Sequence, residues 1–143
     1  MLMLFRWAPV LLAALGAVVF VGCEKAGVKT FPVEGKVELS GSDSNILSGH
    51  VIEAVSEANP EVRAYGSIEP DGSFRMETLH AGKIIDGAQE GKYQVRVVLG
   101  DDDPELRRQA AQRINPRHFD FATSGVSLHV PASNVVLKLD AKQ

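Results

Sequence analysis

Side chains able to bind metal ions or to catalyse reactions are few in this chain and lie far apart along it. The acidic run Asp101–Asp103, followed by Glu105, offers carboxylates to Ca²⁺, but consecutive residues cannot all face one ion and the spaced D-x-D-x-D-G order is missing. No nucleophile elbow, P-loop or paired-carboxylate site can be identified. None of the four histidines stands at a zinc spacing such as H-x-x-x-H; they are His50, His80, His118 and His129. We therefore expect no catalytic residue, no metal and no cofactor, with a calcium loop and a zinc site as less favoured alternatives.

Basic and aromatic residues provide two candidate binding surfaces. Arg107, Arg108 and Arg117, which we call the arginine cluster, are accompanied by Arg113 and His118. The cluster is a candidate contact for an anionic partner such as lipid headgroups or glycan phosphates; the favoured interpretation is the exposed face of an amphipathic helix. A second candidate is a sugar-stacking platform, for which the alternative is a set of aromatic residues that hold loops to the core. Its members are Tyr65, Phe119 and Phe121.

The chain's only cysteine, Cys23, ends a segment that looks like a bacterial lipoprotein signal. Arg6 precedes an uncharged apolar run over Trp7–Gly22, and Val19-Phe20-Val21-Gly22-Cys23 resembles a lipobox. This resemblance implies cleavage before Cys23, a diacylglyceryl group on its sulfur and an acyl chain such as palmitate on its freed amine. The alternatives are an ordinary secretory signal or an uncleaved membrane helix, although the run has 16 residues and contains a proline, whereas a spanning helix needs about 20.

These features predict a signal peptide over 1–22, a lipidated cysteine and tether over 23–30, and one domain over 31–143. The protein is then expected to be anchored to membrane lipid through acylated Cys23, on the periplasmic face or at the cell surface. The net charge of the whole chain is −3, from 15 basic and 18 acidic residues, and loss of Arg6 makes it −4. Such a charge disfavours a nucleic-acid partner, for which a basic face is expected. Without a second cysteine, apolar burial must stabilise the domain.

Period-two alternation of apolar and polar residues predicts strands through most of this domain. Val33–Leu39 alternates most clearly, whereas His50–Val55 has apolar residues in both phases and is expected to be a central strand. Seven short strands at this spacing indicate an all-β sandwich or barrel with antiparallel sheets. The other five are Val62–Ile68, Ser73–Glu77, Lys92–Leu99, Val126–Val130 and Val135–Asp140.

Two local signals are specific. Pro70-Asp71-Gly72, flanked by alternating runs, predicts a β-hairpin. Asp103-Pro104-Glu105 supplies an N-cap, a proline at the first helical position and an acid in the first turn, so one short helix is expected up to Asn115-Pro116. His80–Gly91 is expected to be a loop.

Several segments together resemble the carboxypeptidase regulatory-like, or transthyretin-like, domain of small bacterial lipoproteins. They are Pro32–Val37, Gly66–Phe74, Asp86–Val97, Ile114–Phe119 and Ala122–Val126. This resemblance implies a seven-stranded immunoglobulin-like or prealbumin-like sandwich that has no catalytic residues of its own.

The strand faces predict one core, containing Val37, Phe74, Val95, Val97, Leu128 and Leu137. Arg96 is expected on the solvent side, so that Arg96→Asp should be mild. The expected function is that of a membrane-anchored, non-catalytic binding or structural module whose loops 80–91 and 100–123 contact an unknown protein or glycan. The alternative is an accessory subunit or weak hydrolase with a site in the same loops.

Overall fold

The computed structural model of the chain describes residues 27–143, which form two β-sheets and a few helices. The proposed signal peptide over 1–22 and Cys23 lie outside the described residues. No helix in the described part is long and apolar enough to cross a membrane. The elements are β1 (Glu34–Leu39), η1 (Ser44–Leu47), β2 (Val51–Ser56), β3 (Arg63–Ser67), β4 (Ser73–Arg75), β5 (Glu77–His80), β6 (Lys83–Asp86), β7 (Gly91–Val98), α1 (Pro104–Arg113), η2 (Pro116–Phe119), α2 (Phe121–Ser124), β8 (Val126–Val130) and β9 (Val135–Leu139), where η marks a 3₁₀ helix.

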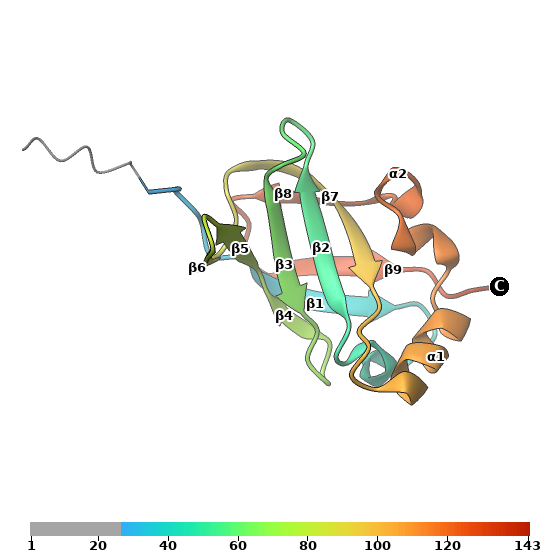
Figure 1. Cartoon of the computed structure of the whole chain (residues 1–143). Coiled ribbons are helices and arrows are strands. Elements are labelled where there is room, and N and C mark those ends of the chain that lie inside the picture. The colour runs from blue at the N-terminus through green and yellow to red at the C-terminus, as the bar shows by residue number, and fades with distance from the viewer. Residues whose placement is uncertain (1–26) are drawn as a thin grey trace, which may run out of the picture.

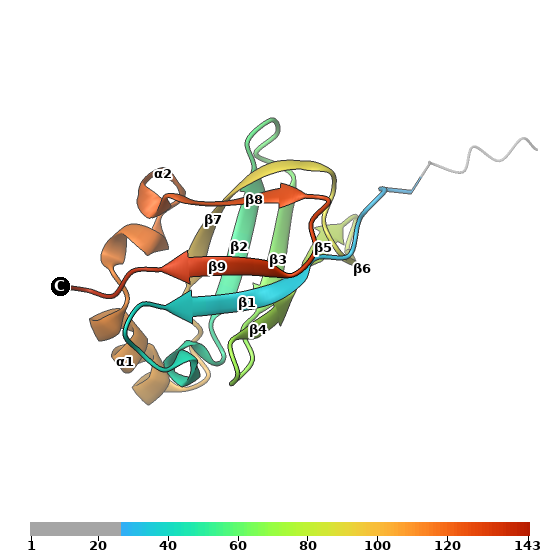
Figure 2. The same ribbon diagram turned by 180° about the vertical axis from the view of Figure 1, so that it is seen from behind.

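The two sheets lie face to face, with β1 and β9 crossing behind β2 and β3 in Figure 1 and in front of them in Figure 2. The smaller sheet has the strand order β4-β1-β9 and the larger one β6-β5-β3-β2-β7-β8. The expectation of a mostly β, two-sheet domain is confirmed. Residues 27–143 contain nine strands instead of the expected seven, because the segment after Gly72 forms two strands and the expected loop His80–Gly91 contains β6.

The expectation of wholly antiparallel sheets is wrong, because β1 and β9 run parallel. Their paired residues extend from Gly35↔Val135 to Leu39↔Leu139. Glycine is required at position 35, since a Cβ there would lie 2.1 Å from the Val135 carbonyl oxygen. Alternation in β1 nevertheless places Val37 and Leu39 in the core as predicted. Alternation reports which side of a strand is buried, not which strand lies beside it.

The predicted hairpin is only partly correct. Its turn is present, with Gly72 at φ +83°, a hydrogen bond from the Glu69 amide to the Ser73 carbonyl, and Asp71 accepting from the Ser73 amide. The second arm, however, divides between the sheets, because β4 pairs with β1 and β5 pairs with β3. The connection therefore joins the two layers at Met76, which is fully buried.

The helix signals are confirmed at α1. The Asp103 carboxylate accepts hydrogen bonds from the amides of Glu105 and Leu106, at 3.0 Å each, and the helix ends at Ile114 before Asn115-Pro116. Ala110 and Ile114 are buried, so this side of the helix attaches it to the sandwich. The helix lies at one end of the domain beside η1 (Figure 1), and the short η2 and α2 follow it.

All six predicted core residues are buried between the sheets. As predicted, β2 is a central strand, and four consecutive residues, Ile52–Val55, are buried in it. One of these four is Glu53. A carboxylate thus lies in the most enclosed strand of the larger sheet.

Candidate functional site

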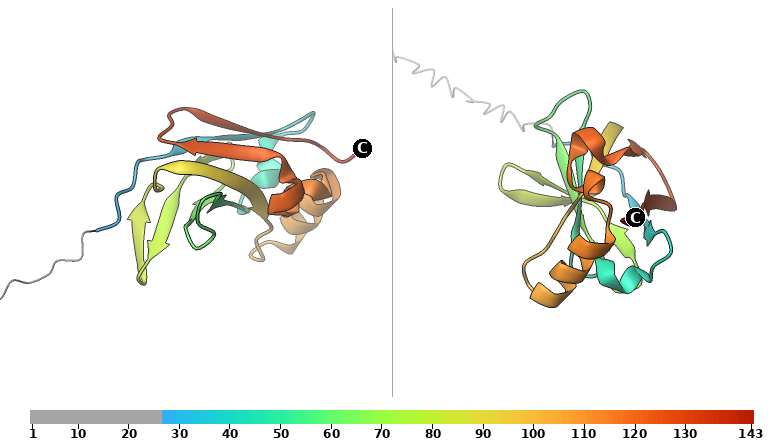
Figure 3. Two further views of the ribbon diagram at one scale, coloured as in Figure 1. Left: turned by 90° about the horizontal axis from the view of Figure 1, so that it is seen from above. Right: turned by 90° about the vertical axis from the view of Figure 1, so that its right-hand side faces the viewer.

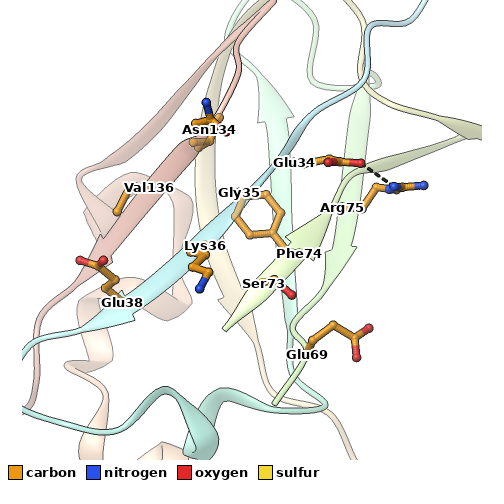
Figure 4. A pocket seen from close by; sticks show the side chains of 11 residues that line it. Glu34, Gly35, Lys36, Glu38, Glu69, Ser73, Phe74, Arg75, Asn134 and Val136 are labelled. Atoms are coloured by element: carbon orange, nitrogen blue, oxygen red, sulfur yellow. Dashed lines mark ion pairs between the residues drawn. The ribbon is translucent and has the colours of Figure 1, made fainter. Parts of the chain in front are cut away.

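A hollow lies on the outer face of the smaller sheet. It has a volume of about 530 Å³ and is formed by β1, β4, the turn before β4 and the start of β9 (Figure 4). Gly35 leaves the middle of β1 without a side chain, and the Phe74 ring lies beside it. The hollow is lined by Glu34, Gly35, Lys36, Glu38, Glu69, Ser73, Phe74, Arg75, Asn134, Val135 and Val136.

Charges of both signs border this hollow. Arg75 pairs with Glu34 at 2.5 Å, and both side chains are more than half exposed. Lys36, Glu38 and Glu69 make no ion pair with any other residue in 27–143. Together with exposed Val136, these groups give the hollow charges of both signs and one apolar side chain.

The opposite face of the molecule carries a buried ion-pair cluster, which we call the Glu53 cluster: Glu53, Arg63, Arg96 and Phe121. Glu53 in β2 lies opposite Arg96 in β7 and accepts from it at 2.6–2.7 Å, while Arg63 in β3 donates to its other oxygen at 2.7 Å. The Phe121 ring lies 4.5 Å from the Arg96 guanidinium and 5.7 Å from that of Arg63. The Glu53 side chain is 6% exposed, so both arginines and the ring exclude water from the carboxylate.

The Glu53 cluster corrects one expectation. Arg96 does lie on the outer side of β7, but it is not a free surface residue, because it neutralises a buried carboxylate. Sequence reasoning missed Glu53, although a signal was present: a single acid stood in a strand whose apolar residues occupied both phases. Such an acid needs a cation from a neighbouring strand.

The candidate aromatic platform is not assembled as one surface. Tyr65 is 37% exposed on β3, Phe119 packs against the core, and Phe121 covers the arginines of the Glu53 cluster. Phe121 thus performs the alternative role, attaching the helical segment to the sheet.

The structure gives two histidines positions inside the fold. His50 accepts a hydrogen bond at Nδ1 from the Gly100 amide at 3.0 Å, and His118 accepts at Nε2 from the Asp140 amide at 2.9 Å. Burial lowers the pKa of both imidazoles below the ordinary 6.5, and nearby Arg107 and Arg117 lower them further. His80 and His129 are exposed. Within residues 27–143 no three His, Cys, Asp or Glu side chains form a group that could hold a metal ion.

Each member of the arginine cluster has an internal carboxylate partner. Arg107 pairs with Asp101 at 2.7 Å, Arg108 with Glu105 at 2.8 Å, and Arg117 with Asp140. Two acids of the candidate calcium loop therefore have structural roles. Asp103 caps α1, and Asp101 forms an ion pair with Arg107. An anionic partner would have to compete with these carboxylates for the guanidinium groups.

Comparison of the chain with protein-family models, with curated proteins and with solved structures finds no match.

Aspartate substitutions at three consecutive residues of β7 test which side chains of this strand are buried and whether Arg96 neutralises Glu53. Val97→Asp places an unpaired charge in the core, and Arg96→Asp sets a second carboxylate against buried Glu53, so each should lower the free energy of unfolding by about 3 kcal/mol or more. Val98→Asp is the matched control, because Val98 is 38% exposed; its effect should stay within about 0.5 kcal/mol. Urea unfolding of the three variants measures these values. A mild Arg96→Asp, close to the control, would contradict the role given to Glu53.

The buried histidines predict how stability depends on pH. The pKa values of both histidines in the folded protein lie below 6.5. At a pH between the folded and the unfolded pKa, the unfolded chain therefore binds more protons than the folded one. The stabilisation is therefore complete above about pH 6.5 and decreases as the pH falls through the folded pKa, by up to about 1.4 kcal/mol per pH unit for each histidine. Unfolding measured at several pH values between about 7.5 and 5 should show this decrease. His118→Gln should reduce the slope, whereas exposed His80→Gln should keep it; equal slopes in both variants would refute the assignment.

Proposed function

We propose that this protein is a lipoprotein on the outer side of a bacterial membrane, where its β-sandwich acts as a binding or structural module without catalytic residues. The observation that carries the proposal is the lipobox-like segment that ends at Cys23, and a short spacer joins this cysteine to the domain. Seven residues after Cys23, the Thr30 hydroxyl donates to the Asp86 carbonyl at 2.6 Å, and the next residue, Phe31, forms a β-bridge with Ala88. A domain that begins so soon after a lipidated residue stays close to the membrane surface.

The immunoglobulin-like or prealbumin-like form of the sandwich, and with it the resemblance to the carboxypeptidase regulatory-like domain, is part of this proposal. Two packed sheets and the tight turn at Pro70-Asp71-Gly72 support it. So does the position of Asp86-Gly87-Ala88, whose backbone leads from β6 towards the long strand β7.

Binding is favoured over catalysis because the buried carboxylate and one nitrogen of each buried imidazole have structural partners. Glu53 is held by two arginines, and His50 and His118 each accept a backbone amide. The hollow on the smaller sheet, in contrast, offers at an open surface charges of both signs that make no ion pair within residues 27–143. We place the main partner contact there, with a protein or glycan as partner and the arginine cluster as a second contact for anionic groups.

Lipidation predicts a defined chemical state of the N-terminus. Mass spectrometry of the protein purified from membranes should find a chain beginning at Cys23 with a diacylglyceryl group on its sulfur and an acyl chain on its amine. Cys23→Ser should abolish both the modification and the cleavage, because the thiol is the acceptor. Phe20→Leu, which places the residue preferred by the lipobox, is the control and should be processed normally. An unmodified Cys23, or a wild-type chain beginning at Met1, would refute the lipoprotein assignment.

Partner binding at the hollow predicts sensitivity to charge exchange there. The double change Lys36→Glu with Glu38→Lys keeps the net charge but inverts the order of charges along β1. It should reduce, by several-fold, the partner recovered when the lipidated protein is cross-linked in membranes and purified. The matched control is Glu90→Lys with Lys92→Glu, two exposed residues outside the hollow. Equal recovery from the two double variants would exclude the hollow as the contact.

A further inference from the structure

The hairpin formed by β5 and β6 exposes two large apolar side chains. Leu79 is 62% exposed and Ile84 is 71% exposed, and they lie directly opposite each other in the antiparallel pair. β6 is also the outermost strand of the larger sheet. An exposed apolar pair on an edge strand favours association with another surface. We therefore expect Leu79 and Ile84 to be covered by a second surface.

A tight turn and a side-chain hydrogen bond define the geometry of the β5–β6 hairpin. Its turn has only two residues, Ala81 and Gly82, both at positive φ (49° and 76°), as a tight type I′ turn requires. At its base the Thr78 hydroxyl donates to the Gly87 carbonyl at 2.7 Å. Figure 3 shows the hairpin projecting from the body of the sandwich.

The tether leaves the domain at the base of this hairpin. Thr30 donates to Asp86, the last residue of β6, and Val28 lines a second hollow together with Leu79 and His80. In Figures 1 and 3 the tether and the hairpin lie at the same end of the molecule, opposite α1. The covalent path from Cys23 to Thr30 has seven residue steps, which span at most about 25 Å. The hairpin is therefore held within reach of any surface in which Cys23 is anchored.

Charges along the hairpin change sign from base to tip. Glu77 and Asp86 oppose each other at the base, whereas His80 and Lys83 oppose each other next to the turn. A basic tip beside two apolar side chains suits the interface of a bilayer, where anionic phosphates lie above the acyl chains. The acidic base would remain in water.

We propose that the β5–β6 hairpin is a second membrane contact, in which Leu79 and Ile84 enter the boundary between headgroups and acyl chains and Lys83 meets lipid phosphates. This inference rests on the proposed anchoring at Cys23. The contact restrains rotation of the domain about the lipid anchor at Cys23 and directs α1 and the loop 100–123 away from the membrane.

The test uses the full-length lipidated protein in vesicles of zwitterionic and anionic phospholipids. In a Leu79→Cys variant, lipidation of Cys23 leaves one free thiol, to which an environment-sensitive fluorophore is attached. Its emission should shift to shorter wavelength on reconstitution and be quenched by lipids carrying a nitroxide near the headgroup. Val98→Cys is the control, because Val98 is exposed and is the last residue of β7, the strand that precedes α1 in the chain; its emission should not change. Adding Lys83→Glu and Ile84→Ser to the Leu79→Cys variant should largely abolish the quenching.

The outcomes separate the two proposals. Two labelled thiols per chain, or protein that does not remain with the vesicles, would refute anchoring at Cys23 and the hairpin contact with it. One labelled thiol on vesicle-bound protein without quenching at position 79 would refute the hairpin contact alone. A shift that requires no vesicles and grows with protein concentration would show that a second copy of the chain covers the hairpin, and would also overturn the proposal.

Discussion

The ion pairs of buried Glu53 are the constraint on which the larger sheet depends. A carboxylate in a central strand must be neutralised where it lies, and the two cations come from the strands on either side, Arg63 in β3 and Arg96 in β7. A one-residue slip of β2 would turn Glu53 into the apolar core and Ile52 or Ala54 outward. The contact thus specifies the register of three strands, and Phe121 extends it to the helical segment by stacking on both guanidinium groups. Breaking such a pair from one side leaves a buried charge, which is why its loss is costly.

With that register established, the two ends of the sandwich acquire different characters. One end holds α1, η1 and the arginine cluster, while the other holds the tether, β5 and β6. The tether is attached through its own hydrogen bond and bridge at Thr30 and Phe31. Such a difference between the two ends suits a domain that is held at one end and presents its remaining surfaces to partners. The hollow on the smaller sheet, with Lys36, Glu38 and Glu69 free of ion pairs within the described residues, is such a surface.

Local features of the fold could be predicted from sequence because their causes are local. The cap of α1 needs only Asp103, Pro104 and Glu105, and the core positions of β1 and β7 follow from alternation. Pairing between distant segments could not be predicted in this way. Alternation does not distinguish a parallel from an antiparallel neighbour, so the β1–β9 pair was missed, as was the division of the hairpin's second arm between the sheets. The candidate site was missed for the same reason, because the hollow exists only once β1, β4 and β9 lie side by side. The glycines of His80–Gly91 predict a loop because they mark turns, whereas in the structure two residues at positive φ, Ala81 and Gly82, close a hairpin there.

We propose that the short segment after Cys23 holds the folded domain directly against a membrane. Neutron reflectometry of the lipidated protein on a supported bilayer measures this arrangement directly. The account predicts a protein layer that begins at the headgroups, with any intervening water layer thinner than the about 25 Å that seven extended residues span. A protein layer separated from the headgroups by a wider gap, or no protein layer after washing, would contradict it.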